Sequence, residues 1–400
     1  MPSQPLPRVV VVLGLVSFCN DLASEMVTPL IPILLAAVLG AGPVALGMIE
    51  GGAEAIAAWF KLWSGRRSDL WGGRRKPFVL GGYLLSNLVR PLMGLVTSWG
   101  MVAGLRGMDR VGKGLRAAPR DALIGDATAV SMRGRAYGLL RALDNGGAMG
   151  GALLAAACLA WTPLTLTQII LLSAVPGLAG VALVAFAVRD MPLAALVEKP
   201  LPPPILPRLS WRDVAPRLRP YLLVLGLFTL ARASETFIVL RGHELKMTVS
   251  LLLLLWAAMS LAKAVAAWCG GHWSDRFGHG RLVLLHWVMH GASFLLLAGV
   301  RSVAMLWVAA LVYGLLAGLG EGAERALVDA LSDNGNGSAG KSQRGTSFGW
   351  YNLVLGVAAI PAGLLFGSLW QQFDAATAFA SAGLLAWCAA WLLYRKVLNV

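Results

Sequence analysis

The segment GMDRVGKG, residues 107–114, is the part of the chain that comes closest to a catalytic motif. Gly107 and, after four residues, Gly112-Lys113 fit the spacing of a Walker A loop, in which glycine N–H groups and a lysine hold nucleotide phosphates. The match is incomplete, because Gly114 stands where a serine or threonine hydroxyl should hold Mg²⁺. Such a loop must also follow a β-strand and open a helix, and no α/β pattern surrounds it. We therefore predict that the protein is not an enzyme and uses no cofactor.

The composition indicates a membrane protein. Of the 400 residues 57% are hydrophobic and 14% charged, and the mean hydropathy is +0.69, whereas soluble domains carry about 25% charged residues. The formal net charge is +14, but the basic residues cluster in short turns between apolar runs. This distribution is the positive-inside pattern of membrane proteins, so we do not expect a nucleic-acid partner. The four cysteines lie in apolar segments with no C-x-x-C pair, which disfavours disulfides and thiolate metal sites.

Twelve segments are long and apolar enough to span a bilayer, which takes about 20 residues. They lie at 9–38, 44–64, 77–97, 99–122, 134–160, 165–188, 220–242, 248–271, 281–300, 303–330, 346–370 and 375–394. Basic turns such as GRRSDLWGGRRK (65–76) alternate with nearly uncharged ones. We therefore predict an all-α, multi-pass protein of the plasma or bacterial inner membrane, with both termini in the cytoplasm.

The two halves of the chain repeat each other. Four short matches occur in the same order in both halves: GLVSFCNDLASE (14–25) with GLFTLARASE (226–235), G-x-x-x-D-x-x-G at 65–72 and 271–278, DALIGD (121–126) with DALSD (329–333), and RGRAYG (133–138) with RGTSFG (344–349). The proline-rich stretch 189–219 lies between the halves and is typical of a linker. We predict an N-terminal six-helix half at 1–188, a cytoplasmic linker at 189–219 and a C-terminal half at 220–400, arranged around a central cavity.

These repeated loops resemble the signature G-x-x-x-D-[RK]-x-G-x-[RK]-[RK] of the major facilitator superfamily. The resemblance covers the whole chain, and it implies that both loops gate the cytoplasmic side. One departure is Leu70, where the family usually has a base. The residues that match are Gly65, Asp69, Gly72, Arg74 and Arg75 in the first copy and Gly271, Asp275, Arg276 and Gly278 in the second.

Two further motifs resemble those of proton-coupled members of the family. In the helix at 99–122, Arg110 and Gly114 match R-x-x-Q-G-x-G, and Lys113 and Arg116 depart from it. At 1.5 Å per residue, Arg110 lies about 16 Å from the start of this helix, near the middle of the bilayer. The next helix keeps the glycines of the antiporter signature G-P-x-x-G-G, at residues 146–151, but lacks its proline. A glycine-rich packing face explains these glycines equally well.

Ionisable residues at membrane depth are costly and usually functional. Asp21 and Glu25 lie one helical turn apart, as do Glu50 and Glu54, and Asp109 can reach Arg106 or Lys113. A carboxyl that alternates between an apolar cavity and a nearby arginine can bind and release a proton. The candidates for proton or substrate binding are Asp21, Glu25, Glu50, Glu54, Arg110, Glu235 and Glu321. The accompanying charges in the helix predicted at 99–122 are Arg106, Asp109 and Lys113. For Arg141 and Asp144 a structural ion pair is the favoured interpretation.

The isolated histidines and methionines give no complete set of metal ligands, so we predict no metal site. Instead we expect a monomeric secondary active transporter that moves a small organic solute by alternating access, with proton-coupled efflux favoured. Proton-coupled uptake of an organic anion, a sugar-like solute or a metal chelate is the alternative. A channel, scramblase or sensor is an alternative of another class. Buried charges of both signs are present, so the sequence does not choose the substrate.

Overall fold

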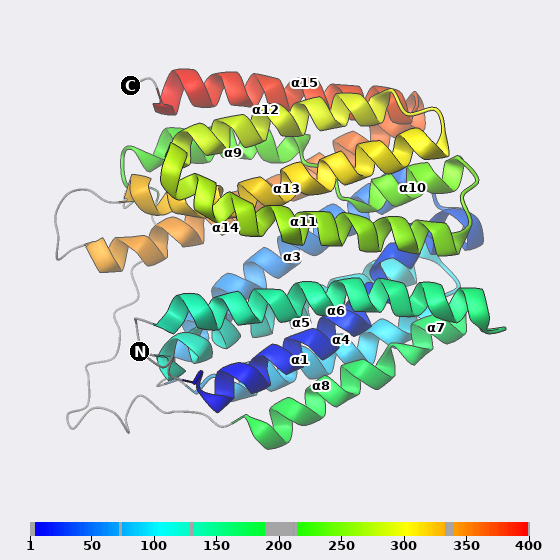
Figure 1. Ribbon diagram of the computed structural model, residues 1–400, viewed down its shortest axis with the longest axis horizontal. Helices are drawn as coiled ribbons and strands as arrows, with labels where there is room; N and C mark the ends of the chain where they lie inside the picture. Colours follow the sequence, from blue (N-terminus) through cyan, green and yellow to red (C-terminus); the bar gives the residue numbers. More distant parts are fainter. Residues whose placement is uncertain are drawn as a thin grey trace. The chain divides into compact units, whose positions relative to one another are not determined.

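The computed structural model describes residues 5–71, 74–128, 132–188, 211, 214–332 and 340–398, apart from the side chains of 69, 133–134, 268–277, 321–322, 329 and 340–346. In this part of the chain every regular element is a helix (Figure 1). The all-α prediction is therefore confirmed. Contacts divide the chain into two units, the first comprising residues 1–31 and 56–206 and the second residues 32–55 and 207–400.

The first unit is built from α1, most of α3 and α4 to α8. Their bounds are α1 Arg8–Glu25, the 3₁₀ turn η1 Thr28–Leu30, α3 Pro43–Leu70, α4 Lys76–Leu92, the 3₁₀ turn η3 Met93–Leu95, α5 Trp99–Ala127, α6 Arg133–Trp161, α7 Leu166–Leu172 and α8 Ala174–Ala187. Helix α1 packs against α6 and α8, and α4 packs against α5. Fully buried Val10, Leu13, Val79 and Tyr83 belong to the core of this unit.

The second unit contains most of α2, the start of α3, the helices α9 to α15 and the π-helical turns η2 and η7. Their bounds are α2 Ile31–Ile33, the π-helical turn η2 Leu34–Val38, α9 Leu218–Ala231, α10 Thr236–Glu244, α11 Val249–Phe277, α12 His279–Ala298, α13 Val303–Ser332, α14 Gly340–Gln372, α15 Ala375–Leu393 and the π-helical turn η7 Tyr394–Leu398. Helix α13 packs against α11 and α12, and α9 packs against α14 and α15. The stacked rings of Phe228 and Trp287, with centroids 4.1 Å apart, lie in its core.

The grouping of residues 32–55 with the second unit has a clear packing basis. Gly47, at the start of α3, lies so close to α14 that a Cβ atom would be 2.0 Å from the carbonyl oxygen of Gly363. A Cβ at Gly51 would lie 2.4 Å from the carbonyl oxygen of Ala359. Small residues at both positions let the two backbones approach. The predicted linker 189–219 lies outside the described residues except for 211 and 214–219, so the predicted division at that point stays a prediction.

The predicted spans correspond to long helical stretches along the described chain. Ten of these stretches are long and apolar enough to cross a membrane. The two other long helices, α3 and α5, have 28 and 29 residues but are more polar. Helix α5 alone carries eight ionisable side chains between Arg106 and Asp126. Composition therefore identifies ten of the twelve predicted spans, and the charges on α3 and α5 explain why these two differ.

Helices are interrupted at one corresponding position in the two units. Helix α1 ends at Glu25 and is followed by the 3₁₀ turn at Thr28–Leu30. Helix α9 ends at Ala231, and α10 begins at Thr236, directly after Glu235. Glu25 and Glu235 are also the last residues of the first repeated sequence match. In transporters, helix interruptions of this kind in corresponding positions of two halves accompany binding sites.

Candidate functional site

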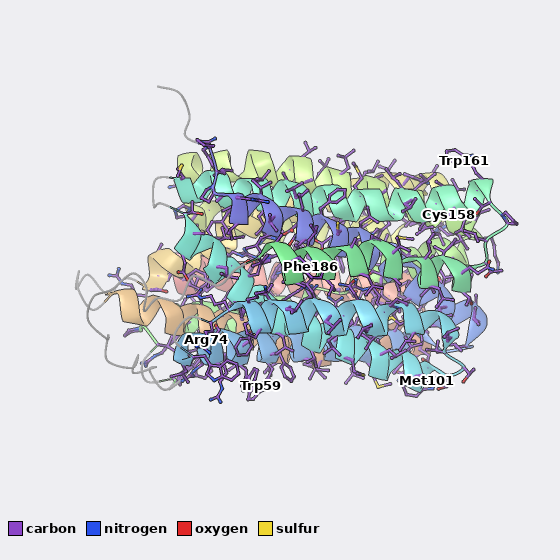
Figure 2. The ribbon with its side chains drawn as sticks, turned by 90° about the horizontal axis from the view of Figure 1, so that it is seen from below. Trp59, Arg74, Met101, Cys158, Trp161 and Phe186 are labelled. Atoms are coloured by element: carbon purple, nitrogen blue, oxygen red, sulfur yellow. The ribbon has the colours of Figure 1, made fainter. Side chains whose placement is uncertain are left out.

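The two ends of the first unit differ in chemistry. In Figure 2 Arg74 lies at one end, and Met101, Cys158 and Trp161 lie at the other. Trp161 is 85% exposed and Phe186, farther along the unit, is 88% exposed. Exposed aromatic side chains of this kind are enriched where helices contact lipid and its interface. The basic turn and the nearly uncharged turn thus lie at opposite ends, as the positive-inside pattern requires.

The Walker-like segment 107–114 lies inside the continuous helix α5. Its glycines serve helix packing. A Cβ at Gly112 would lie 2.6 Å from the carbonyl oxygen of Gly82 in α4, and one at Gly114 would lie 2.8 Å from that of Ala57 in α3. A phosphate-binding loop needs free backbone N–H groups between a strand and a helix, and here helical geometry occupies that backbone. The segment is therefore a crossing point of three helices.

Asp109 is enclosed by basic side chains at the interface between α4 and α5. Its Oδ1 accepts a hydrogen bond from Arg90 Nη2 at 2.8 Å, and Arg106 Nη1 lies 3.7 Å from its Oδ2. The exposed fraction of all three side chains is 3% or less. The hydroxyl of Ser86 donates to the Asp109 carbonyl oxygen and accepts from Arg116 Nη1. The predicted contact between Asp109 and Arg106 is present, but the shorter contact is to Arg90, which the spacing on one helix did not indicate.

A second charged group surrounds Asp21 on α1. Its Oδ1 accepts a hydrogen bond from Asn20 Nδ2 at 2.9 Å, and Arg116 and Arg120 of α5 lie within electrostatic reach. Arg120 also lies 3.7 Å from Asp144 Oδ1 on α6 and donates to Ser17 of α1. The exposed fraction of the Arg120 side chain is 15% and that of Asp144 is 13%. Asp144 thus pairs with Arg120 on another helix, and Arg141, its predicted partner on α6, lies within electrostatic reach of it.

The other predicted site residues lie at varied depths. Glu50 and Arg110 are buried, Glu25 is half-buried, and Glu54 and Lys113 are exposed. The side chains of Asp69, Asp275, Arg276 and Glu321, together with Gly72 and Gly271, lie outside the described residues or side chains. No statement on their predicted roles follows from the structure.

Glu324 on α13 is the centre of the buried polar group in the second unit. It accepts hydrogen bonds from Trp287 Nε1 at 3.0 Å and from the Tyr351 hydroxyl at 3.2 Å. Arg232 Nη1 lies 3.4 Å from its Oε2, and His286 Nε2 lies 3.8 Å from its Oε1. The exposed fraction of the Glu324 side chain is 3%, whereas that of Arg232 is 40%. One side of this ion pair is therefore enclosed, and the other is accessible.

Glu235, at the interruption between α9 and α10, forms the second ion pair of this unit. Its Oε2 contacts Lys263 Nζ of α11, and its Oε1 accepts a hydrogen bond from the Tyr313 hydroxyl of α13 at 3.3 Å. The exposed fraction is 29% for Lys263 and 25% for Glu235. Both charged side chains are thus partly accessible, Lys263 within the long apolar helix α11 and Glu235 at the helix interruption.

Comparison with known proteins identifies the family. Residues 13–240 match the family model described as Major Facilitator Superfamily. The chain belongs to the major facilitator superfamily. An uncharacterized MFS-type transporter of Methanocaldococcus jannaschii is 30% identical over 376 residues, which cover 92% of this chain and 90% of that protein. An uncharacterized protein of Mycobacterium tuberculosis is 29% identical over 377 residues, covering 92% and 88%.

Solved structures of the superfamily share the fold of this chain. The nucleoside transporter NupG, as its D323A mutant, aligns with a TM-score of 0.76 at 11% identity, over 98% of this chain and 99% of that one. A D-xylose–proton symporter aligns with a TM-score of 0.71 at 13% identity, over 98% and 97%. The sequence-based assignment to this superfamily is confirmed, and the protein is a membrane transporter.

The family's gate-loop signature has two described geometric features here. A Cβ at Gly65 would lie 3.2 Å from that of Ala118, so α3 and α5 approach closely at the first loop. At the second loop Gly278 has φ = 86°, a conformation that favours glycine. Arg75 forms an ion pair with Asp126 at 3.2 Å, and Arg74 is exposed. A partner for Arg75 at the end of α5 was not predicted.

Five charged residues with described ion pairs are absent from the sequence-based list of sites. They are Arg90, Arg120, Asp144, Lys263 and Glu324. One signal was available for two of them, because Arg90 and Lys263 are the single charged residues in the predicted spans 77–97 and 248–271. A lone ionisable residue in an apolar span is a candidate by the cost of placing it there.

The histidines of α12 pack within an aromatic cluster. His290 lies 5.3 Å from Phe228 and 4.5 Å from Phe294, measured between ring centroids. His286 Nδ1 lies 3.0 Å from the Leu316 carbonyl oxygen. Among the described residues no group of three histidine, cysteine or acidic side chains is arranged to hold a metal ion.

Proposed function

We propose that this transporter is a proton-coupled secondary carrier that exports a small organic solute by alternating access. The observation that carries the proposal is the group formed by Asp21, Arg120 and Asp144 in a transporter of the major facilitator superfamily. Asp21 and Asp144 lie within electrostatic reach of each other and share Arg120, while Arg116 also acts on Asp21 and Arg141 on Asp144. Because two neighbouring carboxylates repel each other, this repulsion favours a proton on one of them.

The differing exposure of the charges supports a division of roles in the first unit. Asp109 is closed off with Arg90 and Arg106, so we assign it a structural role. Asp21 is half-buried and shares Arg120 with Asp144, so it is our first candidate for the group that binds and releases the proton. Glu25, one turn farther along α1 at the helix interruption, is the second candidate.

The remaining parts of the proposal follow from the family and the charge pattern. The loops at 65–75 and 271–278 are proposed to gate the cytoplasmic side, with both termini in the cytoplasm and the protein acting as a monomer. Export is proposed from the antiporter-like glycines 146–151, although these also have a packing role. The direction of transport is therefore the part of the proposal that the experiment must address first.

Proton movement in proteoliposomes tests this function. Purified full-length protein is reconstituted with a pH-sensitive dye in the lumen, and organic cations, anions, sugars and antibiotics are added in turn outside. We expect one solute class to change the luminal pH with saturable kinetics. Asp21→Asn and Asp144→Asn should abolish the change, whereas Asp374→Asn, which removes an acid from the exposed turn before α15, should not.

The sign of the pH change reports the coupling direction. A solute that enters in exchange for a proton raises the luminal pH. A solute that enters together with a proton lowers the luminal pH, and that result would replace export by uptake. Solute flux that persists unchanged in Asp21→Asn, Glu25→Gln and Asp144→Asn would refute the proton role of these residues. A flux that does not saturate would favour a channel.

A further inference from the structure

The charged side chains of the second unit are not equally accessible. In one ion pair the exposed fraction is 40% for Arg232 and 3% for Glu324, and in the other it is 29% for Lys263 and 25% for Glu235. Lys263 lies near the middle of the 29-residue helix α11, and Arg232 directly follows the last residue of α9. At membrane depth, accessible charges of this kind are costly unless they meet a partner or a ligand. In each of these two ion pairs the base is the more exposed member.

Each acid of this group has neutral hydrogen-bond donors of its own. The Glu324 carboxylate accepts from the indole of Trp287 and the hydroxyl of Tyr351. The Glu235 carboxylate accepts from the hydroxyl of Tyr313. Hydrogen bonds to an ionised group stabilise its charged form. Both carboxylates therefore retain donors when a base turns toward another anion, and the bases can exchange partners without leaving an acid unsatisfied.

The two ion pairs belong to one connected group. Tyr313 hydrogen-bonds to Glu235 and also lies within electrostatic reach of Arg232. The two bases lie beside aromatic rings: the Arg232 guanidinium is 5.9 Å from the centroid of Phe228, and Lys263 Nζ is 5.9 Å from that of Trp256. Aromatic faces hold cationic groups in place without using the donors that would bind an anion. The arrangement favours an anionic ligand over a cationic one.

We propose that Arg232 and Lys263 bind the carboxylate of an organic anion that the protein transports. This inference rests on the proposed transport function and names the substrate class, which the sequence left open because buried charges of both signs are present. Arg232 supplies planar, paired N–H donors that match a carboxylate, and Lys263 supplies a compact positive charge. On binding, the substrate carboxylate takes the place that Glu235 holds next to Lys263.

Equilibrium binding to the purified full-length protein in lipid nanodiscs tests the proposal. The probes are acetate, succinate, benzoate and salicylate, with benzamide as the neutral counterpart and tetraphenylphosphonium as the cation. We expect at least one carboxylate to bind saturably, and benzamide and tetraphenylphosphonium to bind at least about tenfold more weakly than it. Lys263→Gln and Arg232→Gln should each weaken carboxylate binding about tenfold or more, as expected when a charged hydrogen bond is lost.

Two further variants separate a binding role from a structural one. Lys263→Arg keeps the positive charge and should bind within a few-fold of the wild type. Arg301→Gln removes an exposed arginine of the same unit from the turn between α12 and α13 and should leave carboxylate binding unchanged. Thermal melting of every variant establishes that the protein is folded, and Arg232→Gln carries the test if Lys263→Gln does not fold.

The outcomes distinguish this proposal from the transport function on which it rests. Folded wild-type protein that binds none of the four carboxylates, or binding that Lys263→Gln and Arg232→Gln leave unchanged, would overturn it. Proton movement driven by organic cations and not by carboxylates would overturn it as well and leave proton coupling in place. Carboxylate binding that depends on both bases, without proton movement in proteoliposomes, would support it and refute the coupling.

Discussion

The two units of this transporter bury their charges in different ways. In the first unit Asp109 and both of its arginine partners are enclosed together, each with an exposed fraction of 3% or less. In the second unit the acid Glu324 is enclosed to the same degree, but its partner Arg232 is 40% exposed. The difference is instructive, because an ion pair that is closed on both sides stabilises a helix interface, whereas one that is open on the basic side is able to meet a ligand.

Position within the repeat does not account for this difference. Glu25 and Glu235 occupy the same place in the repeated sequence, and each lies at a helix interruption. Glu235 contacts Lys263 and accepts a hydrogen bond from Tyr313, whereas Glu25 lies within electrostatic reach of the acid Asp21. The repeat thus provides the same backbone feature twice, while the side chains that neighbouring helices contribute give the two positions different chemistry.

The largest loss of folding free energy should come from removing the acid of the enclosed ion pair in the first unit. Asp109→Asn removes the carboxylate that faces the buried Arg90 and Arg106, which should cost about 3–5 kcal/mol of folding free energy. We expect little monodisperse protein in size-exclusion chromatography and a strongly lowered melting temperature. Asp121→Asn is the matched control on the same helix, since the exposed fraction of the Asp121 side chain is 43%. Equal melting temperatures for the two variants would show that Asp109 is not a structural acid.

A smaller loss is expected at the corresponding acid of the second unit. Glu324→Gln keeps an acceptor for Trp287 and Tyr351, and the exposed Arg232 can be solvated, so we expect a cost of about 1.5–3 kcal/mol. Thermal melting of this variant beside Asp109→Asn measures the contrast between the units. The comparison fails if Glu324→Gln is the more destabilised of the two.

The sequence predicted the fold well because the signal for it is local. Length, hydropathy and the alternation of basic turns specify each span separately, so the predicted ranges lie within several residues of the helices. The partners of the charged residues are not local. Asp109 meets Arg90 of α4, and Glu324 meets Trp287 of α12, and no spacing within one helix encodes such a choice. The predicted acids on α1 stay candidates, and the bases around Asp21 could be found only after α5 was placed against α1.

The glycines at 146–151 of α6 allow two interpretations, an antiporter motif and a helix-packing face, which single substitutions can separate. A Cβ at Gly151 would lie 2.2 Å from the Leu22 carbonyl oxygen of α1, whereas one at Gly150 would meet only Leu22 Cδ1 at 3.8 Å. Gly151→Ala must therefore push α1 and α6 apart and should cost about 1–3 kcal/mol, while Gly150→Ala should be tolerated. Thermal melting measures both.

Transport by the Gly150→Ala variant adds a functional reading of the same motif. A folded Gly150→Ala protein that transports normally assigns these glycines to helix packing. Loss of transport with an unchanged melting temperature would instead indicate that the glycines take part in the transport cycle, as the antiporter resemblance implies.

The smallest effect concerns the helix caps, where the two units again differ. Helix α7 of the first unit begins with an uncharged capping box formed by Thr165 and Gln168. Helix α15 of the second begins with Asp374, whose Oδ1 accepts a hydrogen bond from the Thr377 N–H at 2.7 Å. That N–H group lowers the pKa of Asp374. A lowered pKa in the folded state adds stability above the unfolded pKa, and the gain is lost as the pH falls through the folded value.

Asp374→Asn isolates this contribution, because asparagine also caps helices but carries no charge. At pH 7 the melting temperature of the wild type should be slightly higher than that of the variant. The difference should be smaller than the change caused by Gly151→Ala, because the cap is exposed. The difference should narrow between pH 5 and pH 3 and vanish below the folded pKa of Asp374. The matching change in the first unit, Thr165→Asn, replaces one uncharged cap with another and should shift melting equally at every pH. If the difference in melting temperature between the wild type and Asp374→Asn is the same at every pH, the carboxylate acts there only as a neutral hydrogen-bond acceptor. The two caps would then be equivalent.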